Sequence, residues 1–291
     1  MDILEILKVI VYGLVEGYTE WLPISSTGHL ILVEELIPLS QPESFMTVFR
    51  VVIQLGAILA VVVMFWNKLW PFFMVGKRSF MEDDEEAVGP VGVRISTLAL
   101  WIKIVIACLP AAIVGIPLDD FLDEHLYNAF VVALMLIVYG VIFIWIERRN
   151  EGVSFPVDRL SRIDIRTALY IGLFQCLSLI PGTSRSGATI IGAMLLGCSR
   201  PVAAEFSFFL GIPVMFGASL LKILKHGLAF NGQQWIILLL GMAVSFVVAL
   251  YAVKFLMEYV RKNNFAVFGY YRIVLGAIVL IYFGVRAIAG I

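Results

Sequence analysis

The sequence predicts an all-α polytopic membrane protein, and its composition and apolar patterning carry this prediction. Of the 291 residues, 61% are hydrophobic and only 15% are charged, whereas a soluble domain carries about 25% charged residues. Long apolar stretches recur along the whole chain. With 21 basic and 22 acidic residues the chain also lacks the basic excess of a nucleic-acid binder, so membrane lipid is an expected partner and nucleic acid is not.

Six stretches are long enough to cross a bilayer, which takes roughly 20 mostly apolar residues. They are residues 45–66, 98–117, 130–146, 202–224, 235–256 and 265–281. Four further apolar stretches are too short to cross: residues 3–15, 30–37, 168–180 and 188–198. The chain is therefore expected to form ten helices, six of them full transmembrane helices.

The short stretches form two pairs, each joined by a polar link that contains Gly, Ser and Pro. The first link reads WLPISSTG at 21–28, and the second reads IPGTSRSG at 180–187. Non-helical backbone at membrane depth is tolerated only where protein encloses it or where it lines a wet cavity. Each pair is therefore predicted to be a re-entrant helical hairpin. The alternative is a pair of short helices joined by an exposed loop.

A shift of the chain by 159 residues aligns the two links. It places Gly28 on Gly187 and Ser25 on Ser184 without a gap. Each unit then holds two short and three long helices, and an odd number of crossings gives the two units opposite orientations, as in many transporters. The prediction is one integral membrane domain, 1–291, built from two inverted-topology repeats, approximately 1–155 and 156–291.

The charges of the connections predict the orientation, because cytoplasmic loops are enriched in Lys and Arg. Basic residues flank the connection after the first long span and fill the one after residue 146, whereas the stretch 119–125 between them has four acids and no Lys or Arg. We expect the basic connections in the cytoplasm and both termini outside. The acidic run MEDDEE at 81–86 is predicted to be a solvated loop.

Two smaller features of the sequence complete its organisation. The N-terminus opens with acids instead of a basic region and has no small-residue cleavage site, so no removable signal peptide is expected. Three cysteines lie inside apolar stretches without the close pairing of a zinc site or a redox pair, and are predicted to be small core residues. They are Cys108, Cys176 and Cys198.

The segment EGYTEWLPISSTGHL at 16–30 gathers side chains that can carry chemistry. Glu16 and Glu20 are four residues apart and share one helical face, where like charges repel. Ionisable groups at membrane depth are costly and usually functional. A divalent cation, an arginine or a proton is expected between the two carboxyls. The alternative is two glutamates near a wet helix end with no role.

The same segment presents hydroxyls just before a helix expected to begin near His29. They belong to Ser25, Ser26 and Thr27, and Gly28 follows them. Hydroxyls there can cap the helix, and the free backbone N–H groups can bind an anion. His29, three residues after Ser26, can act as a base for its hydroxyl. The alternatives are capping alone for Ser25 and Thr27, and a structural hydrogen bond for His29.

The second segment, PGTSRSGAT at 181–189, supplies one guanidinium among hydroxyls. The planar fork of Arg185 suits phosphate oxygens. Alternatively, Arg185 pairs with Glu16 or Glu20 as a buried ion pair, and a substrate phosphate can then displace the carboxylate. Together, these side chains in a lipid-lined cavity suit an anionic head group on an apolar tail, and favour metal-assisted phosphoryl transfer or hydrolysis.

These two segments, with FRVVIQLGA at 49–57, closely resemble the bacterial undecaprenyl-pyrophosphate phosphatase family, also known for bacitracin resistance. The resemblance covers essentially the whole chain. It implies an enzyme of the bacterial cytoplasmic (inner) membrane that hydrolyses undecaprenyl pyrophosphate to undecaprenyl phosphate and inorganic phosphate. The active site would open to the periplasmic or extracellular side, and the product lipid would return to peptidoglycan synthesis. Whether the chain forms a homodimer stays open.

The resemblance also implies residue roles. The paired glutamates of the family correspond to Glu16 and Glu20, with Mg2+ or Ca2+ as the cofactor. Its motif serine and histidine correspond to Ser26 and His29, and its pyrophosphate-binding arginine to Arg185. The rest of the second motif corresponds to Ser184, Ser186 and Thr189. One departure is Arg50, where an acid is expected, which puts any acidic role at that position in doubt.

The expected mechanism places the pyrophosphate on Arg185, on the divalent ion and on the backbone N–H groups of Thr27 and Gly28. The nucleophile is either Ser26 activated by His29, or a water molecule activated by His29 or Glu20. The main alternative function is a transporter or flippase for a lipid phosphate, alone or as a second activity, because inverted repeats are common in transporters. Such a carrier has little use for a serine, a histidine and two glutamates together.

Overall fold

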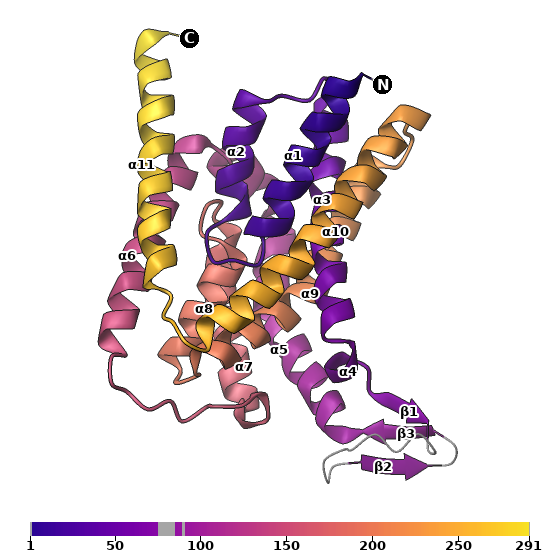
Figure 1. Cartoon of the computed structure of the whole chain (residues 1–291), viewed down its shortest axis with the longest axis vertical. Coiled ribbons are helices and arrows are strands. Elements are labelled where there is room, and N and C mark those ends of the chain that lie inside the picture. Colours follow the sequence, from indigo (N-terminus) through magenta and orange to yellow (C-terminus); the bar gives the residue numbers. More distant parts are fainter. Residues whose placement is uncertain (1, 75–84, 89–90, 291) are drawn as a thin grey trace.

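The computed structural model describes residues 2–74, 85–88 and 91–290, which form a bundle of helices with a small sheet at one end (Figure 1). Its helices are α1 (Ile3–Thr19), α2 (Ser26–Leu36), α3 (Glu43–Met64), α4 (Trp66–Leu69), α5 (Ile95–Leu126), α6 (Ala129–Arg149), α7 (Ile165–Cys176), α8 (Arg185–Leu195), α9 (Arg200–His226), α10 (Gly232–Val260) and α11 (Ala266–Ala289). All but α4 correspond to the ten predicted apolar stretches.

The protein is a multi-pass membrane protein. Within the described residues, six helices are long and apolar enough to cross a bilayer, namely α3, α5, α6, α9, α10 and α11, and they match the six predicted spans. Large apolar side chains such as Ile113, Phe130 and Tyr251 are exposed on the outside of the bundle. Water disfavours such a surface, and lipid suits it. The all-α membrane fold predicted from the composition is therefore confirmed.

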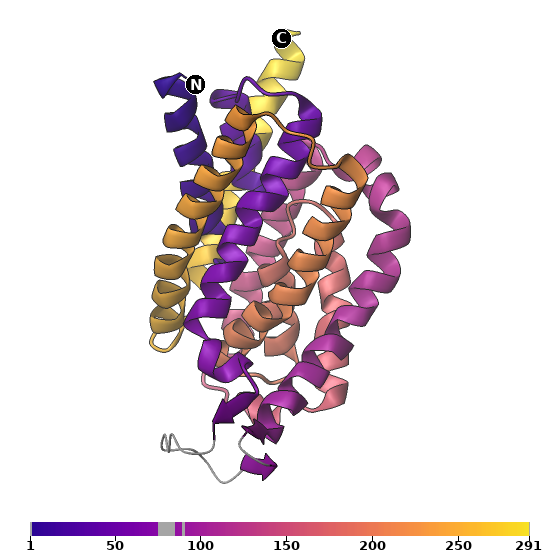
Figure 2. The ribbon, with the colours of Figure 1, turned by 90° about the vertical axis from the view of Figure 1, so that its right-hand side faces the viewer.

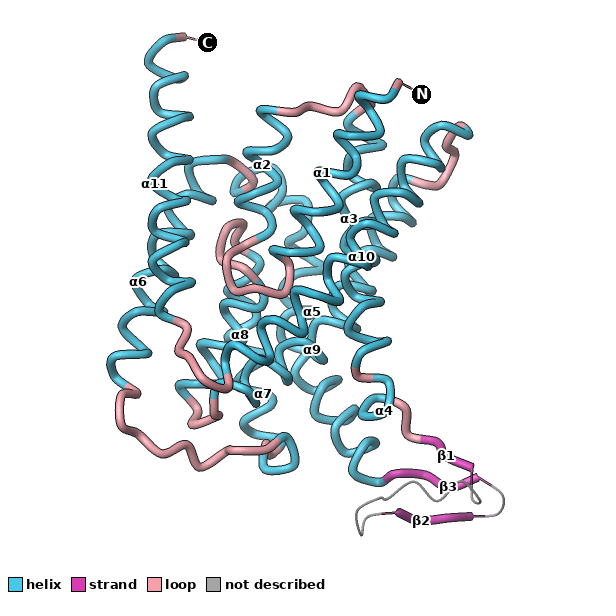
Figure 3. The backbone as a smooth tube through the Cα atoms, in the orientation of Figure 1, coloured by secondary structure: helices cyan, strands magenta, loops and turns pink. Residues whose placement is uncertain are grey.

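Both polar links lie at mid-height of the bundle, between α1 and α2 and between α7 and α8 (Figure 3). A short 3-10 helix, Leu177–Leu179, follows α7 in the second link. The two chain termini lie together at the end of the bundle opposite the sheet (Figures 1 and 2). Each link thus sits between the two ends of the long helices, where a membrane-embedded site is expected.

The helices after the links begin earlier than predicted. α2 begins at Ser26 instead of near His29, and α8 begins at Arg185 instead of residue 188. The length of the apolar runs did not reveal where these helices begin. A helix start depends on backbone hydrogen bonds and on a capping residue, and it can therefore include polar side chains. The polar residues Ser26 and Arg185 therefore lie in the first turn of a helix.

The two links share one local backbone geometry. Ser25 and Ser184 have positive φ angles of 73° and 71°, which is uncommon for residues other than glycine. Each hydroxyl oxygen caps the following helix, because it accepts the N–H of Gly28 at 3.3 Å and of Gly187 at 3.2 Å respectively. These are the pairs that the 159-residue shift aligns. The likeness supports the inverted repeat, which stays a prediction.

Helix α5 continues through residues that were expected to form a connection. It runs to Leu126, although the apolar stretch ends at residue 117 and prolines 110 and 117 lie inside the helix. The acidic stretch 119–125 is thus the last part of α5, and the connection to α6 shrinks to Tyr127 and Asn128. The change from apolar to acidic residues marks where the helix leaves the apolar region and not where it ends.

A three-stranded antiparallel sheet follows α4, with the strand order β1-β3-β2 (Figure 1). Its strands are β1 (Phe72–Met74), β2 (Glu85–Val88) and β3 (Val91–Arg94). The run at 81–86 was predicted to be a loop, but its last two residues begin β2, and residues 81–84 lie outside the described residues. The short strands have no alternating pattern in the sequence that would have predicted them.

The three cysteines are free thiols, and the prediction that they are core residues is confirmed for Cys198 alone. Cys198 is buried, and Cys108 and Cys176 are partly buried. No disulfide among them holds the bundle together, so its packing depends on helix contacts. The closest of these contacts lie at Gly17, Gly56 and Gly172, where a Cβ would meet a carbonyl oxygen of a neighbouring helix.

Candidate active site

The two links contact each other in the middle of the bundle. The Ser186 hydroxyl, at the start of α8, lies 3.4 Å from the carbonyl oxygens of both Glu20 and Leu22 in the first link. It also lies 3.1 Å from the Ser184 hydroxyl. The candidate site residues of the two segments are therefore brought together, although they are more than 150 residues apart in the chain.

A buried arginine from α11 binds both links. Arg272 has no exposed surface. It donates hydrogen bonds to the carbonyl oxygens of Pro23 in the first link, at 3.2 Å, and of Gly182 and Thr183 in the second, each at 2.8 Å. Its guanidinium lies 5.6 Å from the Tyr139 ring centroid. Within the described residues no carboxylate pairs with it, so its charge is balanced by backbone oxygens and the Tyr139 ring.

One carboxylate joins the functional groups of the two segments. The Ser26 hydroxyl donates a hydrogen bond of 2.6 Å to Glu20 Oε2. On the other oxygen, Oε1, Glu20 pairs with Arg185 Nη2 at 3.3 Å. The side chains of Glu20 and Arg185 are only 7% and 9% exposed. The arginine predicted near the glutamates is therefore present, and it pairs with Glu20.

The Arg185 guanidinium is held in place by its surroundings. Its Nη1 donates to the Ser207 carbonyl oxygen at 2.7 Å, and its Cζ lies 5.0 Å from the Trp21 ring centroid. Gly211 leaves room for it, because a Cβ there would lie 2.7 Å from Cζ. The buried Nε has no hydrogen-bond partner in the described part of the chain.

A cavity of about 210 Å³ lies between the links and helices α3 and α9. Its polar lining comes from Glu20, Ser25, Ser26, Thr27, Gln54, Ser178, Ser184 and Arg185. The rest comes from Pro181, Gly182, Val214, Met215 and Ala218. Six of the predicted site residues therefore face one space, with apolar side chains of α9 on its other wall. This lining suits a charged head group joined to an apolar chain.

His29 does not contact Ser26 as predicted. Its ring nitrogens lie 2.7 Å from the Ser25 carbonyl oxygen and 2.7 Å from the Tyr271 hydroxyl, and its ring stacks on that of Tyr271. The spacing of three residues on one helical turn would have allowed His29 to contact Ser26, but both ring nitrogens of His29 have other partners. The hydroxyl of Ser26 is bound to Glu20 instead. His29 therefore orients the first turn of α2 in this structure.

Three predicted substrate-binding residues lie outside the cavity lining. The N–H of Gly28 is taken by the Ser25 hydroxyl, which corrects the prediction that it is free for an anion. The Thr189 hydroxyl lies 2.6 Å from the Ser207 hydroxyl and is fully buried. Ser186 is bound between the links. These residues support the wall of the cavity.

Glu16 is buried in α1, with 2% of its surface exposed, one helical turn before Glu20. Among the described residues its carboxylate has no hydrogen-bond or ion-pair partner. No group of three or more His, Cys, Asp or Glu side chains in the described part of the chain could hold a metal ion. Two carboxylates together with phosphate oxygens are ligands of the kind that Mg2+ or Ca2+ takes, so a divalent cation at Glu16 and Glu20 stays a prediction.

Three functional candidates were missed in the sequence. Gln54 and Ser178 line the cavity. Gln54 could have been found in the sequence, because it lies in the FRVVIQLGA segment that carries the family resemblance. Arg272 gave a clearer signal, because a charged residue inside a predicted span is costly and usually functional. Arg50, the departure in that segment, lies away from the cavity lining and binds Glu34 Oε1 at 2.6 Å.

The sequence matches known proteins along nearly its full length. It matches the family described as bacitracin resistance protein BacA over residues 9–278. It is 55% identical over 280 residues to an undecaprenyl-diphosphatase of Acetivibrio thermocellus, covering 96% of this chain and 98% of the relative. It is 55% identical over 281 residues to an undecaprenyl-diphosphatase of Enterococcus faecalis, covering 97% and 98%. The chain therefore belongs to the BacA family of bacitracin resistance proteins.

Proposed function

We propose that this protein is an undecaprenyl-diphosphatase. It hydrolyses undecaprenyl pyrophosphate to undecaprenyl phosphate and inorganic phosphate, which returns the lipid carrier to peptidoglycan synthesis and confers bacitracin resistance. The relatives that carry this name match over almost their entire length. The observation that carries the proposal is the Ser26–Glu20–Arg185 arrangement at a cavity, because it combines a nucleophile, a base and an anion-binding group.

In the first step, the terminal phosphate binds the Arg185 guanidinium and takes the place of Glu20 there. The planar guanidinium of Arg185 can bind two phosphate oxygens, whereas Glu20 offers it a single carboxylate oxygen at 3.3 Å. Glu20 then loses its contact with Arg185 and keeps its contact with Ser26. The Ser26 hydroxyl attacks the terminal phosphorus, its proton passes to Glu20, and the bond to the bridging oxygen breaks. Undecaprenyl phosphate leaves, and a phosphoserine remains.

In the second step, water attacks the phosphorus of the phosphoserine and the bond to the Ser26 oxygen breaks. That oxygen takes back the proton held by Glu20, and the protons of the water leave with inorganic phosphate or pass to the solvent. Arg185 balances phosphate charge in both steps, at a buried position where charge stabilisation is strong. Thr27 and Ser184 line the same cavity and can donate hydroxyl hydrogen bonds to phosphate oxygens. Glu16 and Glu20 would hold Mg2+ or Ca2+, and this ion would neutralise part of the phosphate charge.

The proposed location is the bacterial cytoplasmic membrane, with the cavity open to the outer side. Two features support this orientation. The last turn of α6 and the connection after it carry arginines at 148, 149, 159 and 162 on the sheet end of the bundle, and such basic segments are typically cytoplasmic. The cavity is lined by Val214 and Ala218 in the second half of α9, which leads towards the end that holds both termini.

The experiment that tests the function is phosphate release by the purified protein from farnesyl pyrophosphate, a soluble isoprenyl pyrophosphate, with and without EDTA. We expect release in the presence of Mg2+ or Ca2+ and its loss on chelation. The Ser26→Ala variant loses activity, whereas Ser44→Ala, at an exposed position of α3, is the matched control. Near-normal release by Ser26→Ala would remove the phosphoserine step. Full activity of Arg185→Ala would overturn the site.

A further inference from the structure

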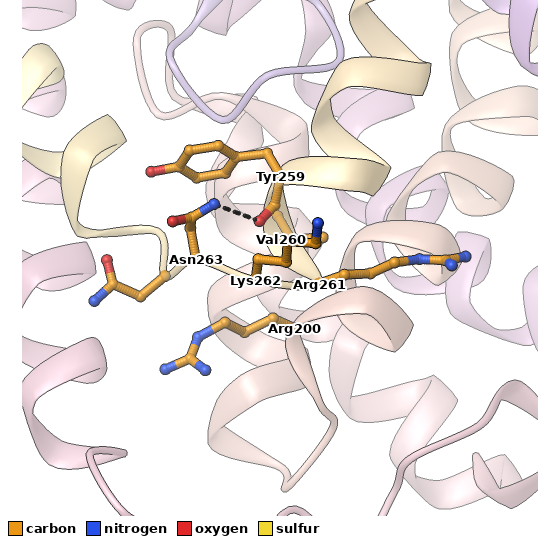
Figure 4. A pocket seen from close by; sticks show the side chains of 7 residues that line it. Arg200, Tyr259, Val260, Arg261, Lys262 and Asn263 are labelled. Atoms are coloured by element: carbon orange, nitrogen blue, oxygen red, sulfur yellow. Dashed lines mark hydrogen bonds between the residues drawn. The ribbon is translucent and has the colours of Figure 1, made fainter.

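A second hollow lies at the sheet end of the bundle, where α10 ends and α9 and α11 begin (Figure 4). It has a volume of about 370 Å³ and is lined by Arg200, Tyr259, Val260, Arg261, Lys262, Asn263 and Asn264. We refer to it as the basic hollow. It shares no lining residue with the cavity at the links, so any ligand it holds has no contact with the candidate active site.

A buried carboxylate fixes two walls of the basic hollow. Glu147 at the end of α6 is 4% exposed and accepts hydrogen bonds from Arg200 Nε at 2.9 Å and 3.0 Å on its two oxygens. The same carboxylate accepts the backbone N–H of Phe265 at 2.8 Å, just before α11. Arg200 and the connection between α10 and α11 are therefore held in a fixed relation without any ligand.

The opening of the basic hollow is strongly positive. Arg261 and Lys262 are exposed, and within the described residues neither has an ion-pair partner. They are the two cations of the lining without a carboxylate partner in the described part of the chain, because the third, Arg200, is paired with Glu147. Asn263 is oriented by a hydrogen bond of 3.1 Å from its amide nitrogen to the Tyr259 carbonyl oxygen, as Figure 4 shows. Cations and amides around a preformed space are suited to an anion with several oxygens.

We propose that the basic hollow binds the phosphate head group of an anionic phospholipid in the leaflet on that side of the membrane. The hollow lies at the ends of membrane-spanning helices, which is the level of lipid head groups. Basic pockets between transmembrane helices on the cytoplasmic side bind such head groups. Arg261 and Lys262 supply the positive charge at the opening, and Arg200, held by Glu147, forms part of the wall. A soluble phosphate monoester shares this chemistry, so the test separates the two sources.

The test measures binding of a fluorescent phosphatidylglycerol to the purified full-length protein in detergent, with phosphatidylcholine as the uncharged reference. The variant Arg261→Gln/Lys262→Gln removes two charges from the hollow. The matched control Arg159→Gln/Arg162→Gln removes two charges from the same end of the bundle, outside the hollow. Both variants keep phosphate release from farnesyl pyrophosphate, which reports that they are folded. Competition with glycerol 3-phosphate identifies a site for soluble phosphate.

We expect the hollow variant to bind phosphatidylglycerol at least tenfold more weakly, since each Lys or Arg near an anionic lipid surface contributes about a fivefold change. The control variant and all phosphatidylcholine measurements remain unchanged. An equal loss of phosphatidylglycerol binding in the two variants would overturn the proposal, because the lipid would then be attracted by the positive charge of this end of the bundle and not by the basic hollow. Unchanged binding by the hollow variant, or full displacement of the lipid by an equal concentration of glycerol 3-phosphate, would also overturn it.

Discussion

At the scale of the residue, Glu20 decides how the site works. It accepts the Ser26 hydroxyl on one oxygen and holds Arg185 on the other, so it links the nucleophile of one segment to the cation of the other. The residue types of this set could be predicted from the sequence. Their pairing could not, because the spacing of Ser26 and His29 on one helix turn suggested a contact that the structure replaces with Tyr271.

Glu20→Gln is expected to lower kcat for phosphate release by roughly 10²- to 10⁴-fold, the usual contribution of a general base. The amide keeps the shape of the side chain but cannot take the proton of Ser26. Glu43→Gln is the matched control, because that glutamate pairs with Arg50 at 2.8 Å, outside the cavity lining. A kcat within twofold of the wild type would contradict the role of Glu20, whatever the effect on KM.

Arg272→Met is expected to lower kcat/KM by about 10- to 100-fold and to lower the melting temperature. The substitution leaves three buried carbonyl oxygens without donors, at a cost of about 1–3 kcal/mol for each unsatisfied group. Arg272→Lys retains the charge and some donors, and should recover part of both losses. Lys254→Met, at an exposed position of α10, is the control. Wild-type kinetics in Arg272→Met would show that the links keep their positions without this arginine.

At the scale of the element, the six spans could be predicted because a bilayer requires long apolar runs, and each one is present as a helix. The helix ends could not. α2 and α8 begin at caps formed by Ser25 and Ser184, and α5 continues past its apolar stretch. Caps and carbonyl partners depend on backbone conformation, which hydropathy does not report. The small sheet after α4 was not predicted either, because its short strands have no alternating pattern of apolar and polar residues.

Helix α9 provides a direct test of how an element positions the site. Gly211→Ala would place a Cβ 2.7 Å from the Arg185 guanidinium carbon, so the arginine must move. We expect a rise in KM of about tenfold or more, in line with the loss of a charged hydrogen bond. Gly217→Ala, on the same helix with open space at its Cβ, should leave KM unchanged. Equal KM values for the two variants would show that this close contact does not hold the guanidinium.

At the scale of the whole molecule, both chain termini lie at one end and the basic connections at the other (Figure 2). The sequence predicted this separation from the Lys and Arg counts alone. The meeting of the two links required the structure, because no local pattern indicates which loops contact each other across more than 150 residues. Arg272 illustrates the point, since its charge was visible in the sequence but its three carbonyl partners were not.

The orientation in the membrane is testable by cysteine labelling. In a chain whose three native cysteines are replaced by alanine, Asn231→Cys before α10 is expected to react with a membrane-impermeant maleimide on intact cells. Asn263→Cys, after α10, should react only after lysis. Both positions are exposed, so accessibility to the reagent depends on the side of the membrane. The reverse pattern would invert the proposed topology and place the active-site cavity on the cytoplasmic side.

The contact between the links has a consequence for how the protein can be divided. Glu20 and Ser26 belong to the first half of the chain, Arg185 belongs to the second half, and Arg272 near the C-terminus holds both links. Neither half contains a complete site. Two separately expressed halves would therefore have to assemble in one membrane before either could act, and a truncation that removes only α11 would disable a centre whose nucleophile lies near the start of the chain.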